Sequence, residues 1–118
     1  MDGLIIKKKW IDKILSGEKT LEVRGTRTNK VGEEIYLFES GSKKVRGTAE
    51  IDSCFKVTRE AWEEFKELHC VEITYDELLY VYKEPYFWKL KNAYENIEDW
   101  HYVHPAGAVI WVKNPEFE

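Results

Sequence analysis

The sequence predicts an α+β domain that is mainly β: a mixed, mostly antiparallel barrel of about five to six strands with two to three short helices. Segments of alternating apolar and polar residues, typical of half-buried strands, recur along the chain. Stretches with helical spacing follow the first predicted strand and occupy the middle of the chain. The length of 118 residues suits one hydrophobic core, so we expect a single domain over residues 1–118.

The N-terminus predicts a short strand followed by a helix. Residues 4–6 form an apolar run typical of a strand. The next apolar residues recur at helical spacing: Trp10, Ile11, Ile14 and Leu15. Because Gly17 stands where a helix that ends at Ser16 needs a residue in the left-handed conformation, we expect the helix to end there.

Residues 17–25, GEKTLEVRG, combine charged side chains with an alternating pattern. As a strand, this segment would turn its polar residues to one side and its apolar residues to the other, that is Thr20, Glu22 and Arg24 against Leu21 and Val23. Glu22 and Arg24 would then project in the same direction, about 7 Å apart. The polar row is either a solvated strand face or a row that faces a ligand from a rigid support.

Two further strands are predicted in the centre of the chain. Residues 35–39 are apolar on both faces, which indicates burial, and residues 40–44 form a turn. Residues 45–54 alternate again and carry Gly47 and Ala49 on the inward face. Small inward residues indicate a tightly curved sheet, because bulky side chains would collide at its centre.

Two amphipathic helices with acidic outer faces follow. Thr58 is expected to cap the first, whose apolar stripe is Ala61, Trp62, Phe65 and Leu68. Thr74 followed by Glu77 predicts a capping box that opens the second helix, which Pro85 ends. We expect both helices to cover the core and to leave their acids in solvent.

The last part of the chain returns to strands. An alternating strand begins at Tyr86, and residues 108–112 are expected to form a final apolar strand. Between them, residues 95–107 are predicted to form a loop, which is rich in aromatic rings and histidines.

Net charge excludes one class of partner. At −4, the chain lacks the positive field with which a non-specific duplex DNA binder holds phosphates. Contacts to nucleic acid must therefore be local, and the basic residues do cluster: Lys7, Lys8 and Lys9, then Arg24, Arg27 and Lys30, then Lys43, Lys44 and Arg46. The five tryptophans supply flat rings for the core or for stacking on a planar ligand.

The remaining composition bears on location and cofactors. Cys54 and Cys70 form no C-x-x-C pair and have no histidines at a zinc-like spacing, which indicates a reduced, intracellular protein. No stretch of about 18 consecutive apolar residues occurs, so no membrane partner is expected. The sequence predicts a cytoplasmic monomer with no metal site and no cofactor.

Four residues of the segment GEKTLEVRG resemble a known signature. Gly17, Lys19, Glu22 and Arg24 match the G-x-K-x-x-E-x-R pattern of ASCH domains (activating signal cointegrator homology), which belong to the PUA-like superfamily. Three later features, in the same order, are similar to the family's layout: Val31-Gly32, Arg46-Gly47-Thr48-Ala49, and Gly107-Ala108 leading into Trp111-Val112. The resemblance covers nearly the whole chain.

This resemblance implies a PUA-like pseudobarrel with a cleft that binds RNA or a single, often modified, nucleotide or nucleoside. Lys19 and Arg24 are then expected to contact phosphate or carbonyl oxygens, and Glu22 to accept from a base amino group or to hold Arg24. Thr20 and His104 are further candidates for ligand binding. The candidates for stacking on a base are Trp10, Tyr36, Phe38, Trp88 and Trp100.

The resemblance is also compatible with catalysis, with Lys19 and Glu22 as candidate catalytic residues. Small ASCH amidohydrolases that act on acetylcytidine use a lysine, a threonine and a glutamate. Lys19 matches the lysine, Glu22 occupies the place of the threonine, and the candidates for the acid are Glu72 and Glu77. Burial would lower the pKa of Lys19 and Glu22 would raise it, and the sign decides whether Lys19 can serve as a base.

A ribonuclease and an adaptor are also compatible with the sequence. Another ASCH branch resembles a metal-dependent ribonuclease, in which His101 and His104 would act as base and acid while Lys19 or Arg24 stabilises the charged transition state. A protein-interaction adaptor would instead use the acidic helices between residues 59 and 82.

Overall fold

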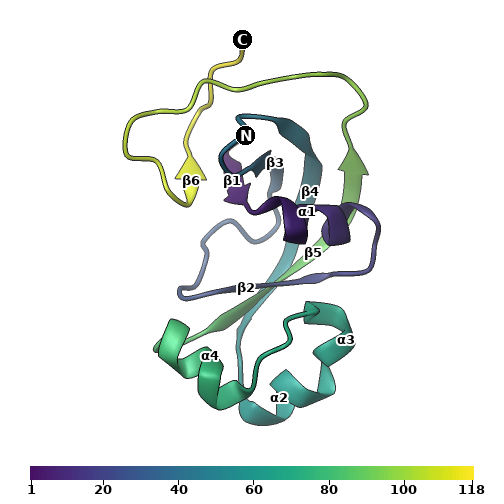
Figure 1. The fold of residues 1–118 in the computed structure, drawn as a ribbon, viewed down its shortest axis with the longest axis vertical. Helices are drawn as coiled ribbons and strands as arrows, with labels where there is room; N and C mark the ends of the chain where they lie inside the picture. Colours follow the sequence, from purple (N-terminus) through teal and green to yellow (C-terminus); the bar gives the residue numbers. More distant parts are fainter.

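Six strands form one mixed half-barrel sheet in the computed structural model, which describes residues 1–118 (Figure 1). The strands are β1 (Gly3–Ile6), β2 (Leu21–Arg24), β3 (Glu34–Glu39), β4 (Val45–Lys56), β5 (Tyr86–Glu95) and β6 (Trp111–Val112). Their order across the sheet is β2-β5-β4-β3-β1-β6. Only β1 and β3 pair in parallel, and all other neighbours are antiparallel. The predicted fold class is confirmed.

Four short helices accompany the sheet: α1 (Lys8–Leu15), α2 (Arg59–Glu64), α3 (Lys66–His69) and α4 (Tyr75–Val81). In Figure 1, α2, α3 and α4 gather at one end of the molecule, in the connection between the long strands β4 and β5. None of the helices is long and apolar enough to cross a membrane.

The first helix forms and ends as its sequence predicts. Ile11 and Ile14 of α1 are buried in the largest core cluster, together with Leu4 and Ile6 of β1. Gly17 adopts a φ of 86°, the left-handed conformation that allows the chain to turn after the helix. The segment that follows therefore leaves α1 in a fixed direction.

The small residues of β4 are required by its neighbour β5. Gly47 is buried, and a Cβ atom at this position would lie 2.0 Å from the carbonyl oxygen of Tyr94. Ala49 is fully buried in the core cluster that also contains Ile11 and Ile14 of α1. The pairing of β4 with β5 shifts register between Thr48 and Glu50 and again between Ile51 and Ser53, and such irregularities bend a sheet.

The first predicted amphipathic helix is interrupted. Phe65 has φ −98° and ψ 21°, which separates α2 from α3 and changes the face that α3 buries. Leu68 is therefore 41% exposed instead of lying on the buried stripe, and His69 is fully buried. This interruption is also why there are four helices where two to three were expected. The capping box at Thr74 and Glu77 is confirmed, with both reciprocal bonds formed.

The C-terminal part differs in detail from the prediction. β6 contains only Trp111 and Val112 because its pairing with β1 is limited to Leu4 and Gly3. The preceding loop contributes to an aromatic cluster with Phe38 and Phe117 on the β1–β3 side of the sheet. In this cluster Phe38 stacks on Tyr102 with ring centroids 3.9 Å apart, and Trp100 stacks on Phe117 at 4.4 Å.

Candidate functional site

A cleft of about 660 Å³ lies between the α1 side of the sheet and the α4 end of the molecule. Its lining comes from β1, Trp10 of α1, β2, the chain after α3, α4, Trp88 of β5 and the segment before β6. Twelve of the 19 lining residues are hydrophobic, so the few polar groups in the cleft decide what it can recognise.

Lys19, Glu22 and Arg24 form one charged cluster in the wall of this cleft. Arg24 donates to Glu22 Oε2 from Nε at 2.9 Å and from Nη2 at 2.7 Å. Lys19 Nζ lies 3.8 Å from the other carboxylate oxygen, Glu22 Oε1. Lys19 is 1% exposed and Glu22 is 4% exposed, so this is a buried cluster rather than a solvated strand face.

Backbone contacts fix both cations. Arg24 Nη2 donates to the carbonyl oxygen of Ile5 at 3.0 Å. Lys19 Nζ donates to the carbonyl oxygen of His69 at the end of α3. Each cation is therefore tied to an element remote in sequence, β1 for Arg24 and α3 for Lys19.

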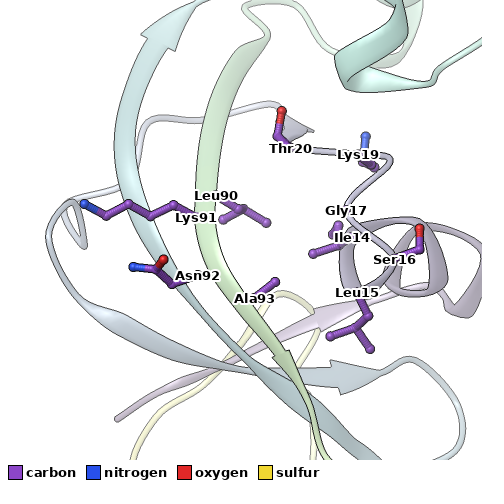
Figure 2. Close-up of a pocket in the computed structure, with 10 residues that line it drawn as sticks. All are labelled: Ile14, Leu15, Ser16, Gly17, Lys19, Thr20, Leu90, Lys91, Asn92 and Ala93. Atoms are coloured by element: carbon purple, nitrogen blue, oxygen red, sulfur yellow. The ribbon is translucent and has the colours of Figure 1, made fainter.

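The segment that carries the cluster is a strand only in part. β2 begins at Leu21, because Lys19 N–H donates to the carbonyl oxygen of Lys13 and Thr20 N–H to that of Leu68. Thr20 does not line the large cleft. It lines a smaller cavity of about 220 Å³ between the end of α1 and β5, where Figure 2 shows Thr20 and Lys19 at one end and Leu15 at the other.

Two tryptophans accompany the cations. Lys19 Nζ lies 4.8 Å from the centroid of the Trp10 ring, and Arg24 Cζ lies 5.8 Å from the Trp88 ring, both within the range of cation–π attraction. Trp88 is 1% exposed and belongs to the core, and its Nε1 donates to the carbonyl oxygen of Thr26. Trp10 is only partly buried, so its ring is the more accessible of the two.

The electrostatics of the cleft set the direction in which the pKa of Lys19 shifts. Burial lowers the pKa of Lys19 below its usual range, and the carboxylate of Glu22 opposes this effect without cancelling it. Arg24 adds to the lowering through like-charge repulsion. A lysine with a lowered pKa inside a cleft is a feature common at functional sites.

The remaining candidate residues lie outside the cleft. Trp100 packs in the aromatic cluster with Phe117, and His104 Nδ1 is hydrogen-bonded to the Tyr102 hydroxyl at 2.9 Å. His101 pairs with Lys44 in an isolated bridge. None of the three residues Trp100, His101 and His104 lines the cleft, so the structure does not bring the histidines to Lys19 or Arg24.

The two acids considered for an amidohydrolase are also outside the cleft. Glu72 and Glu77 are both exposed, and Glu77 accepts from the backbone N–H of Thr74 in the capping box. No group of three or more His, Cys, Asp or Glu side chains is placed to hold a metal ion.

Sequence reasoning missed His69. Its ring stacks on Trp62 at 3.7 Å, and its Nδ1 accepts from the N–H of Val71 at 3.0 Å. Since Nδ1 accepts, Nε2 carries the proton and donates to the carbonyl oxygen of Trp62 at 2.8 Å. Burial lowers the pKa of His69, and Lys19 contributes to the lowering. Helical spacing is the signal that marks His69, because it lies four residues after Phe65 and seven after Trp62 and so shares their face.

Comparison with known proteins identifies a family and similar folds. A family model for the ASCH domain matches residues 4–111. The fold is similar to the crystal structure of a serine-to-alanine mutant of ZmASCH from Zymomonas mobilis, with a TM-score of 0.66 and 17% identity over 80% of this chain and 69% of that chain. A tyrosine-to-phenylalanine mutant of ZmASCH gives a TM-score of 0.64 and 15% identity over 80% of this chain and 70% of that chain. The fold is also similar to the crystal structure of ASCH from Zymomonas mobilis, with a TM-score of 0.64 and 14% identity over 80% of this chain and 68% of that chain. No curated protein matches the chain.

Proposed function

The chain belongs to the ASCH domain family, whose fold is of an RNA-binding type. We propose that it binds RNA or a nucleotide by taking a base into the cleft beside Lys19, Glu22 and Arg24.

The buried charged cluster in an apolar cleft carries this proposal. Burying charges costs several kcal/mol of desolvation per ion, on the order of the whole gain from pairing them. The three charges carry a formal net charge of +1 with Lys19 protonated, so folding alone leaves them incompletely compensated. A ligand with electron-rich oxygens would complete the compensation, which favours binding over a purely structural role.

The shape and the rim of the cleft support a base as the buried part of the ligand. The volume of about 660 Å³ lies in the range of small-molecule sites, roughly 300–1,000 Å³. The partly buried ring of Trp10 offers a stacking surface. Lys7 is exposed and also lines the cleft, where it is suited to a phosphate of the same ligand.

Hydrolysis at the same site is the second candidate, and the lowered pKa of Lys19 favours it. A lysine that loses its proton more readily is a better general base. Thr20 lies outside the cleft and Glu22 is held by Arg24, so the attacking group would have to be a water molecule.

Fluorescence anisotropy with a labelled single-stranded RNA tests the proposal. We expect Arg24→Gln to weaken binding about tenfold or more, as loss of a charged hydrogen-bonding partner does. Arg59→Gln is the matched control, because Arg59 is exposed on α2, pairs with Asp76 and does not line the cleft. Equal weakening by both variants, or no binding by the unmodified chain, would overturn the proposal. The second candidate is tested by incubating the protein with acetylcytidine and measuring the products by chromatography. Turnover that is lost in Lys19→Met would establish hydrolysis.

A further inference from the structure

The hydrogen-bonding capacity of the carboxylate in the cleft is already used. Glu22 Oε2 accepts two bonds from Arg24. Its Oε1 accepts from the backbone N–H of Val23 at 3.3 Å and faces the Lys19 ammonium at 3.8 Å. Glu22 is also the only carboxylate in the lining, which contains no Asp, Asn, Gln or His. The cleft therefore offers no free side-chain acceptor except the hydroxyls of Ser40, Thr26 and Tyr82, each of which can also donate.

The cations, by contrast, retain free donors. Arg24 uses Nε and Nη2 within the protein, whereas Nη1 with its two N–H groups has no protein partner. Lys19 has three N–H groups, of which one is bonded to the His69 carbonyl oxygen and another faces Glu22. The polar side of the cleft is thus a set of donors that Glu22 holds in place.

We propose that the cleft selects a base with a keto oxygen at pyrimidine C4 or purine C6, as in uracil or guanine, and places this oxygen against the free Nη1 group of Arg24. The inference rests on the proposed function and specifies its ligand. At this ring position uracil and guanine present a keto oxygen that accepts from Arg24 Nη1, whereas cytosine and adenine present an amino group whose N–H donors would face those of Arg24. A phosphate fits less well at this depth, because the mostly apolar lining would strip its hydration.

This selectivity is tested by titrating each of the four nucleosides into the protein and measuring binding by the change in tryptophan fluorescence. We expect uridine and guanosine to bind about tenfold more tightly than cytidine and adenosine, in line with the discrimination that paired donors provide. Arg24→Gln replaces donors with a group that both donates and accepts, so the preference should shrink towards equality. Arg59→Gln should retain it.

Two outcomes would overturn the inference. One is equal or tighter binding of the amino bases, and the other is competition by inorganic phosphate as effective as that by uridine. If RNA binding still weakens in Arg24→Gln under either outcome, the proposed function survives and only the keto selectivity is wrong. If neither RNA nor any nucleoside binds, both are wrong.

Discussion

Arg24 holds one oxygen of Glu22 with two N–H groups, from Nε at 2.9 Å and from Nη2 at 2.7 Å. The sequence leaves two roles for this carboxylate, accepting from a base or holding Arg24, and the geometry favours the second. Because the other oxygen of Glu22 faces Lys19, one buried anion separates two cations. Glu22 thus orders both cations, and in the proposed function these cations face the ligand.

Glu22→Gln should lower the free energy of unfolding by about 3–5 kcal/mol, because removal of one partner leaves buried charges uncompensated. Urea denaturation measures this loss. The control is Glu50→Gln, which removes a partly exposed carboxylate 3.8 Å from Lys91 and should cost less than about 1 kcal/mol. Equal losses in the two variants would show that the cluster adds nothing to stability beyond an ordinary surface pair.

The stability contributed by Lys19 should depend on pH with a defined sign. Burial lowers the pKa of Lys19 in the folded chain below its ordinary 10.5. Between the folded pKa and 10.5 the unfolded chain therefore binds more protons than the folded one. The free energy of unfolding of the unmodified chain should therefore rise with pH in this window, relative to that of Lys19→Met. Urea denaturation of both proteins at several pH values from neutral to about 10 checks it. A difference that stays constant or falls would contradict the lowered pKa.

His69 should produce a loss of stability on acidification. Burial lowers its pKa below 6.5, so between the folded pKa and 6.5 the unfolded chain binds more protons, and stability falls as the pH decreases through this window. Protonation would also remove the bond that Nδ1 accepts from Val71. His69→Gln should flatten the dependence of the unfolding free energy on pH.

His104→Gln is the control for the His69 experiment, because His104 is exposed. This variant should keep the slope of the unmodified chain. If His104→Gln flattens the slope and His69→Gln does not, the acid sensitivity arises in the C-terminal aromatic cluster instead.

Gly47→Ala should lower the free energy of unfolding by about 1–3 kcal/mol, because the new Cβ would overlap the Tyr94 carbonyl oxygen and β5 would have to shift. Thermal unfolding measures the loss. Thr48→Ala on the same strand is the control and should cost under about 1 kcal/mol, since it removes atoms without creating a clash. A Gly47→Ala variant as stable as this control would mean that β4 and β5 are free to separate locally.

Local chemistry was readable from the sequence. Gly17 ends α1 because only glycine adopts its φ without strain, and Thr74 with Glu77 opens α4 because their bonds span only three residues. Alternation alone predicts Gly47 as an inward small residue. Such features depend on neighbours in the chain, so the order of elements and the signature segment could be predicted.

Contacts across the chain decided the rest. An alternating pattern reports which side of a strand a residue takes, and not what packs over that side. Lys19 can be buried because α3, 50 residues later, supplies the His69 carbonyl oxygen as the partner of its ammonium group. Lys19, Glu22 and Arg24 stand close together on one segment in any fold, so their proximity follows from the sequence alone. Packing between distant elements establishes that Lys19 and Glu22 are buried and that Glu22 is bonded to Arg24. The same packing brings Trp10 and Trp88 to the cations and leaves Trp100 in another cluster.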